Sequence, residues 1–217
     1  MTIRRPSKRR APRVVYPKPL PCVLVAVDQA RTSGWSIYVG GKPVDWGEVD
    51  AADAPRIEQI LRNGCNLATR LQLPVVVLGE EHGRYGFRGG AKEGLGAAWG
   101  SWRFACERLN AQGLPIVMTR VTRVNTKTWR SAFGMAAMRS EVAKKYAPLR
   151  AREELGVDVP DEQHNAAEAL LIGLWGVRAG AVGAKLPKRV MERWATEPAV
   201  TFGDATKKQD ERNERGV

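Results

Sequence analysis

The chain has 217 residues, of which 43% are hydrophobic, and its 35 basic and 23 acidic residues give a formal net charge of +12. This apolar fraction is normal for a globular protein, so a sizeable core is expected and wholesale disorder is not. The positive charge favours a polyanionic partner, with nucleic acid first and an anionic membrane surface second.

Membrane-spanning and secreted proteins are the classes that the sequence supports least. No apolar run approaches the roughly 18 residues of a membrane span, and the short run after the basic N-terminus lacks a small-residue cleavage site. The three cysteines, Cys22, Cys65 and Cys106, form no Cys-x-x-Cys pair, so neither a zinc site nor a disulfide framework is indicated. We expect a cytoplasmic protein, of a bacterium or of a virus in its host. Residues 1–19 are basic and acid-free, which leaves an organellar transit peptide open.

Composition divides the chain into three parts. Residues 1–21 carry seven basic and no acidic side chains, which predicts a flexible basic arm. Such an arm, with Arg9 and Arg10 at its centre, either keeps the protein soluble or contacts phosphates. Residues 22–180 hold the apolar patterns of one domain, and residues 181–217 are a polar tail.

Hydrophobic periodicity and glycine pairs predict the elements of this domain. In the first half of the domain, these patterns predict a strand at 23–27, a hairpin of strands 35–39 and 43–49 around Gly40-Gly41, a helix at 53–72 and a strand at 74–78. Its second half predicts a loop at 83–90, a helix at 94–109, a strand at 115–118, helical segments at 128–133 and 140–146, and an apolar helix at 162–177. This order indicates an α/β fold whose mixed sheet combines antiparallel hairpin strands with parallel strands and is flanked by helices.

Two of the predicted strands end on acidic residues. Asp28 ends the first strand, and Glu80 and Glu81 follow the strand at 74–78. Open α/β sheets place their sites at the carboxyl ends of strands, and a buried carboxylate needs a partner such as a cation. The alternative for Asp28 is a turn aspartate that caps its own loop.

A third polar group opens the apolar helix at 162–177. Asn165 and Glu168 are three residues apart and share one helix face. A solvent-facing Glu168 is the alternative, and Asp161 with Glu162 is expected to cap the helix N-terminus. Three acid clusters suit Mg²⁺, which takes carboxylate oxygens and keeps waters for a phosphate. Two such ions would clamp the attacking and leaving oxygens of a phosphodiester.

The order of these motifs resembles the RuvC-type Holliday junction resolvases of the RNase H-like nuclease superfamily, and one segment resembles their phage members. The resemblance spans roughly residues 22–178. The matching segments are VLVAVDQARTSGW at 23–35, PVVVLGEE at 74–81, VNTKTWRSAFGM at 124–135 (the phage-like segment) and HNAAEALLIGLWG at 164–176.

This resemblance implies a set of catalytic and metal-binding positions. They are Asp28, Glu80, Asn165 and Glu168, with Glu81 and His164 as alternative ligands. Two positions depart from the family pattern. Asn165 stands where Asp or His is usual, and Glu168 is one methylene longer than the usual Asp, so either can weaken metal binding.

The resemblance also implies an activity and partners. It implies a homodimer that cuts four-way DNA junctions with two Mg²⁺ ions, for which Mn²⁺ can substitute, in DNA recombination, repair or phage DNA processing. The expected dimer helix is 94–109, because Gly96, Ala97 and Gly100 permit close approach. Packing of those small residues on the protein's own sheet is equally compatible with the sequence.

Basic and aromatic residues outside the acid clusters are expected to contact DNA. Cations mixed with aromatics suit phosphate contact and base stacking, whereas a solvated loop is the alternative for the first group. The residues are Arg84, Tyr85, Phe87, Arg88 and Lys92, then Arg123, Lys127 and Arg130, and Arg9 and Arg10 of the arm. Trp129, within the second group, is expected to pack in the core.

Two other functions remain compatible with this sequence. One is a different RNase H-like nuclease that cuts flaps or processes RNA. The other is a module that binds branched DNA and cuts it weakly, because Asn165 and Glu168 hold metal poorly. Cleavage of a substrate panel with and without Mg²⁺ separates all three.

Overall fold

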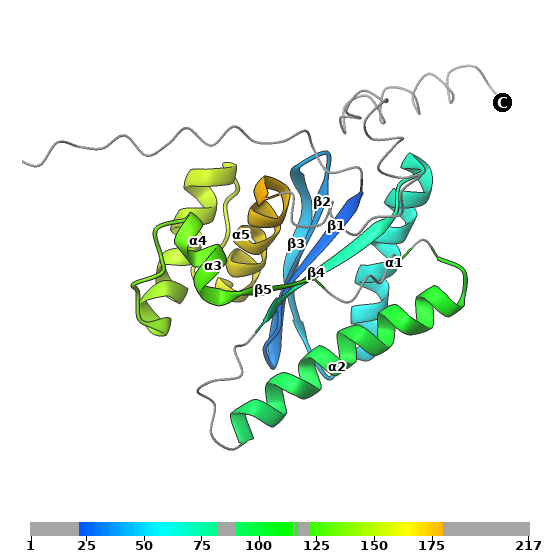
Figure 1. Ribbon diagram of the computed structural model, residues 1–217, viewed down its shortest axis with the longest axis horizontal. Coiled ribbons are helices and arrows are strands. Elements are labelled where there is room, and N and C mark those ends of the chain that lie inside the picture. The colour runs from blue at the N-terminus through cyan, green and yellow to red at the C-terminus, as the bar shows by residue number, and fades with distance from the viewer. Residues whose placement is uncertain (1–21, 82–89, 115, 117–121, 180–217) are drawn as a thin grey trace, which may run out of the picture.

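The computed structural model describes residues 22–81, 90–114, 116 and 122–179. In this part of the chain, strands in the order β3-β2-β1-β4-β5 form one mixed sheet (Figure 1). The hairpin strands β2 and β3 pair antiparallel with β1 and with each other, whereas β4 and β5 run parallel to β1. The strands are β1 (Val23–Asp28), β2 (Thr32–Val39), β3 (Lys42–Asp50), β4 (Val75–Glu81) and β5 (Thr122–Asn125).

Helices cover both faces of this sheet (Figure 1). On one face lie α1 (Ala54–Leu71) and α2 (Gly90–Ala111), and on the other lie α3 (Thr126–Ala132), α4 (Ser140–Leu155) and α5 (His164–Ala179). The mixed sheet between two helical layers confirms the predicted fold class.

The central strand β1 explains why the sheet carries two cores. All six of its residues are buried, and successive side chains of a strand point to opposite faces. Val23, Val25 and Val27 therefore enter the core beneath α1 and α2, whereas Leu24 and Ala26 enter the core beneath α5.

Hydrogen bonds from β2 fix α5 against the sheet. The Ser36 hydroxyl donates to the carbonyl of Ala169 at 2.9 Å, and the Tyr38 hydroxyl donates to the carbonyl of Leu170 at 2.6 Å. Both side chains are buried, so each bond satisfies a polar group that would otherwise be costly to bury. The two anchored carbonyls directly follow Glu168 in the chain.

Several elements differ from the sequence-based predictions. Of the predicted strand at 115–118 only Ile116 is described, and it forms an isolated bridge with Val75. The strand that pairs with β4 is β5 instead, a short polar segment whose one apolar residue is Val124. The helices α2 and α4 extend further than 94–109 and 140–146, and α4 continues through Pro148.

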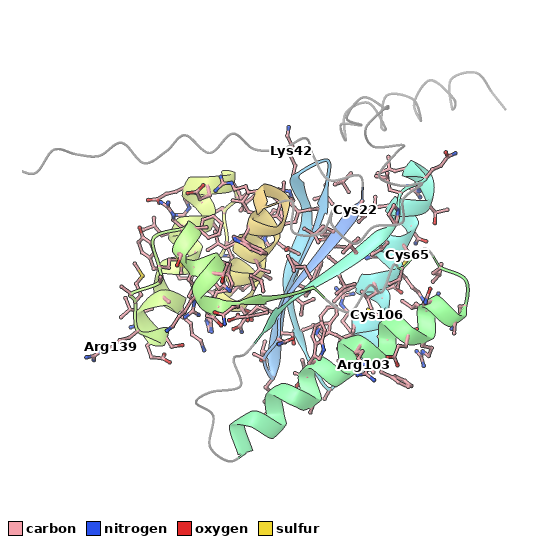
Figure 2. All side chains as sticks on the ribbon, viewed as in Figure 1. Cys22, Lys42, Cys65, Arg103, Cys106 and Arg139 are labelled. Atoms are coloured by element: carbon pink, nitrogen blue, oxygen red, sulfur yellow. The ribbon has the colours of Figure 1, made fainter. Side chains whose placement is uncertain are left out.

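The three cysteines, labelled in Figure 2, are buried and free. Burial raises the pKa of Cys22 and of Cys106 to about 12, so neither thiol carries appreciable thiolate at neutral pH. No described helix has the length and apolar character needed to cross a membrane. The predicted basic arm and the polar tail lie outside the described residues.

Candidate active site

Two neighbouring parallel strands bring the first two acids together. Val27 of β1 pairs with Gly79 of β4, so Asp28 and Glu80 are the next residues along adjacent strands. Their exposed fractions are 5% and 2%. Asp28 and Glu80 are therefore buried carboxylates at one edge of the sheet, as the strand-end pattern predicts.

The third acid comes from α5. Glu168 is 3% exposed, and Asn165, one turn earlier, is also buried. The solvent-facing alternative for Glu168 is therefore wrong. The Ser36 hydroxyl holds the carbonyl of Ala169, so the helix segment that carries Glu168 is tied to β2.

Electrostatics show that the three acids share one environment. Burial raises the pKa of Asp28 well above its ordinary value, and the charges of Glu168 and Glu80 raise it further. Burial also raises the pKa of Glu168, which Glu80 raises too and Arg130 lowers. Glu80 and Glu168 therefore make Asp28 costlier to ionise, and Glu80 has the same effect on Glu168, a cost that a nearby cation would offset.

One cation from α3 contacts this cluster directly. Nη2 of Arg130 lies 2.6 Å from Oε1 of Glu168, in a pair whose side chains are only 14% and 4% exposed. The guanidinium carbon stands 5.3 Å from the centroid of the Trp129 ring. Trp129 itself is fully buried, which confirms its predicted packing role.

Two further polar contacts hold the second acid in place. The Thr126 hydroxyl, at the start of α3, donates to the carboxylate of Glu80. The side-chain amide of Gln29 donates to the backbone carbonyl of the same residue. Sequence analysis missed both, although Gln29 directly follows Asp28 and Thr126 follows β5 at the same edge of the sheet.

The start of α5 is held by a residue that sequence analysis also missed. Oε1 of Glu48, on β3, accepts hydrogen bonds from the backbone N–H groups of Asn165 at 2.9 Å and Ala166 at 3.3 Å. Asp161 and Glu162, expected to cap this helix, are exposed. A carboxylate near a helix N-terminus satisfies unpaired donors and complements the helix dipole, and here it comes from the neighbouring strand.

The structure describes the remaining predicted residues to different extents. Lys127 is exposed on α3, His164 is partly exposed at the first position of α5, and Glu81 is the last residue of β4. Only the backbone of Arg123 on β5 and of Lys92 on α2 is described, and the same holds for Glu81. Four predicted DNA contacts, Arg84, Tyr85, Phe87 and Arg88, and the arm residues Arg9 and Arg10 lie outside the described residues.

The donor set of the cluster suits a hard divalent cation, because carboxylate oxygens are the ligands that such a cation prefers, and among the described residues only Arg130 forms an ion pair with one of the three acids. In this structure, however, Glu168 is already paired with Arg130. Within the described ranges, no three acidic, histidine or cysteine side chains stand around one point as ligands of an ion. The residue types therefore fit Mg²⁺, whereas the described side chains are not arranged around one point as its ligands.

Solved structures with this arrangement of strands and helices were found among DNA-junction enzymes. Thermus thermophilus RuvC in complex with a Holliday junction substrate is 20% identical, with a TM-score of 0.50 over 74% of this chain and 97% of that chain. The chain has the RuvC fold.

A second RuvC structure from the same organism gives the same identity and TM-score over 74% and 96% of the two chains. The yeast mitochondrial Holliday junction resolvase Ydc2 is 9% identical, with a TM-score of 0.38 over 82% and 86%. No protein-family model matches the chain, and no curated protein matches it. The RuvC fold agrees with the resemblance noted in the sequence motifs.

Proposed function

We propose that this protein is a structure-specific DNA endonuclease that resolves four-way junctions by Mg²⁺-dependent phosphodiester hydrolysis. The observation that carries the proposal is the cluster of three buried, mutually repelling carboxylates, Asp28, Glu80 and Glu168, within a RuvC fold. Burial of three neighbouring acids costs free energy of folding, and groups of this kind are concentrated at functional sites.

In this proposal the carboxylates of Asp28, Glu80 and Glu168 hold Mg²⁺, with the amide oxygen of Asn165 as a weaker donor. Bound Mg²⁺ would lower the pKa of an attacking water and stabilise the leaving 3′-oxygen. The protein's part is positioning. Thr126 orients the Glu80 carboxylate, and Glu48 with Ser36 fixes the helix that carries Asn165 and Glu168.

Cations near the acid cluster support a DNA backbone as the substrate. Lys127 is exposed on α3, and Lys144 of α4 is close enough to lower the pKa of Glu168. Phosphate contacts of this kind fix the register of a nucleic acid without reading its bases. The net charge of +12 adds attraction that falls steeply with salt.

We further propose a homodimer that pairs through α2. Trp99 and Trp102 of this helix are buried against the sheet, whereas Gly96, Ala97 and Gly100 are exposed. The small residues predicted for a dimer helix therefore face away from the protein's own sheet.

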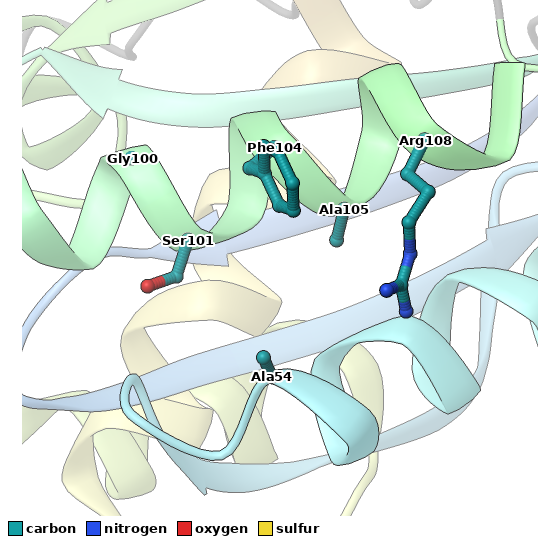
Figure 3. Close-up of a pocket in the computed structure, with 6 residues that line it drawn as sticks. All are labelled: Ala54, Gly100, Ser101, Phe104, Ala105 and Arg108. Carbon is teal, nitrogen blue, oxygen red and sulfur yellow. The ribbon is translucent and has the colours of Figure 1, made fainter. Parts of the chain in front are cut away.

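The same exposed side of α2 carries an aromatic residue beside a hollow. Phe104 is 64% exposed. It borders an open hollow of about 300 Å³ between α1 and α2, lined also by Ala54, Gly100, Ser101, Ala105 and Arg108 (Figure 3). A two-fold axis across this helix would present the same patch twice, so that each Phe104 covers the partner's hollow.

The test is cleavage of a substrate panel by the full chain, with Mg²⁺ and with chelator. The panel holds a synthetic four-way junction, a linear duplex, a 5′ flap and an RNA–DNA hybrid of matched length. The proposal predicts paired nicks on the junction that disappear in chelator. Preferred cutting of the flap or hybrid would instead favour another RNase H-like nuclease, and tight junction binding without nicks would favour a binding module.

A further inference from the structure

Arg130 is the single basic residue that the described part of the chain places within hydrogen-bond distance of the three-acid cluster. Its Nη2 lies 2.6 Å from Oε1 of Glu168, and both side chains are largely buried. A guanidinium stays protonated at any working pH, and a charged hydrogen bond is about twice as strong as a neutral one. Glu168 is thus neutralised by a permanent positive charge from the protein itself.

The local structure of α3 fixes the position of Arg130. This helix begins directly after β5, and the side chain of Asn125 caps it by accepting the N–H of Lys127. The neighbouring Trp129 is fully buried and lies beneath the guanidinium. The capped helix α3 and the buried Trp129 ring therefore fix the guanidinium at the acid cluster.

The hydrogen bonding of Arg130 is nevertheless incomplete. Its buried Nε has no hydrogen-bond partner among the described residues. A guanidinium that binds a carboxylate with both edges of its fork would use Nε or the second Nη as well. Among the described residues, the hydrogen bond to Glu168 and the Trp129 ring are the contacts that hold the charged group in this position.

That contact occupies one of the two carboxylate oxygens that Glu168 could offer to a metal ion. An oxygen that accepts a short charged hydrogen bond cannot offer the same lone pair to a cation, and a fixed positive charge repels a second one. Consistent with this, the described acids do not surround any one point as a set of metal ligands.

We infer that Arg130 is an internal counter-cation that competes with the divalent metal ion for Glu168. It stabilises the acid cluster in the metal-free protein and leaves Glu168 when metal binds. The inference rests on the proposed function in that it takes Glu168 as a metal ligand. Once displaced, the guanidinium lies on the same helix as the exposed Lys127, where phosphate is its natural partner.

The test measures Mn²⁺ binding by calorimetry to the full chain without DNA, at one fixed pH. The variants are Arg130→Gln and, as a matched control, Lys127→Gln, which removes an exposed cation from the same helix. We expect Arg130→Gln to tighten Mn²⁺ binding about tenfold, because a repelling charge and a competing donor are removed. Lys127→Gln should change it less than about twofold, as for a screened surface charge.

Thermal unfolding gives a second readout on the same samples. In chelator Arg130→Gln should melt below the wild type, and saturating Mn²⁺ should remove that difference. An unchanged or weaker Mn²⁺ affinity in Arg130→Gln would overturn the inference, since it would make Arg130 a group that orients Glu168 for the metal. Absence of Mn²⁺ binding in every protein would overturn the metal site of the proposed function as well, so the two failures are distinguishable.

A measurement on the wild type covers the case in which Arg130→Gln does not fold. Side-chain NMR of ¹⁵N-arginine-labelled protein follows the Arg130 Nε–H signal, assigned with the conservative variant Arg130→Lys, during a Mg²⁺ titration. We expect this signal to shift over the concentration range in which Mg²⁺ binds. A signal that stays unchanged at saturating Mg²⁺ would show that Arg130 keeps its place on Glu168 and would refute the competition.

Discussion

Gly34 of β2 lies directly against Asn165 of α5, so closely that a Cβ atom at Gly34 would come within 1.8 Å of the Asn165 carbonyl oxygen. Gly34 pairs with Asp28 in the sheet. A residue without a side chain therefore lets the helix that carries Glu168 approach β2 at the position paired with Asp28.

The first prediction concerns Gly34→Ala. The added methyl group must push α5 away from β2, so we expect a loss of about 1–3 kcal/mol in the free energy of unfolding. Junction cutting should fall further than stability alone explains, because Glu168 moves with the helix. Thermal melts and nicking rates measure the two effects. A melt for Gly34→Ala equal to that of the wild type would contradict the contact.

The second prediction concerns the cap that Glu48 provides to α5. Removal of its carboxylate in Glu48→Ala leaves the N–H groups of Asn165 and Ala166 without their acceptor, which should cost about 1 kcal/mol. Glu162→Ala removes an exposed acid that precedes the same helix and should leave the melting temperature unchanged. Equal effects of the two variants in chemical denaturation would mean that Glu48 does not cap the helix.

The third prediction is a pH dependence of the metal-free protein. Burial and the neighbouring acids raise the folded-state pKa of Asp28 above its ordinary 3.8. Between these values the folded protein holds a proton that the unfolded chain has released, so stability falls as pH rises through that window. Asp28→Asn removes the cost of ionising this buried carboxyl group. We therefore expect its melting temperature in chelator to exceed that of the wild type by at least about 2 °C at pH 8.

At pH 4 the same two proteins should melt at similar temperatures, because Asp28 is then largely protonated in the folded state. Melts from pH 4 to pH 8 in chelator make the comparison. If Asp28→Asn were less stable than the wild type at pH 8, Asp28 would be a structural residue whose charge stabilises the fold.

The fourth prediction concerns the proposed dimer face on α2. Phe104→Glu places a charge in the patch that would pair across the two-fold axis, so it should convert a dimer into a monomer in light scattering after size exclusion. The control is Val142→Glu on α4, which alters another exposed apolar side chain, 53% exposed. Dimers in both variants would exclude this face, and a monomeric wild type would exclude the dimer itself.

The acids were predictable from sequence where a strong local pattern led to them. Asp28 and Glu80 each end an apolar strand, and apolar runs of that kind locate buried strands well. Glu168 was suggested by its apolar neighbours on one helix. The strand β5 was not found, because only Val124 among its four residues is apolar.

The groups that support the acids could not be predicted, because they act across long sequence separations. Glu48 caps a helix that begins more than a hundred residues later, and nothing in the local pattern of a hairpin strand indicates that role. Arg130 was predicted to contact DNA, since a basic residue beside other basic residues suggests phosphate. Its pairing with Glu168 depends on how α3 and α5 pack, which local sequence does not specify.

The central claim is that Asp28, Glu80 and Glu168 form a metal-dependent nuclease site. The most direct test compares wild type and Asp28→Asn on one labelled four-way junction with Mg²⁺, and records nicking and binding on the same samples. The account predicts paired nicks by the wild type, none by Asp28→Asn, and equal junction affinity, because the substitution leaves the basic surface intact. Nicking by Asp28→Asn at the wild-type rate would contradict the account, as the site would then lie elsewhere.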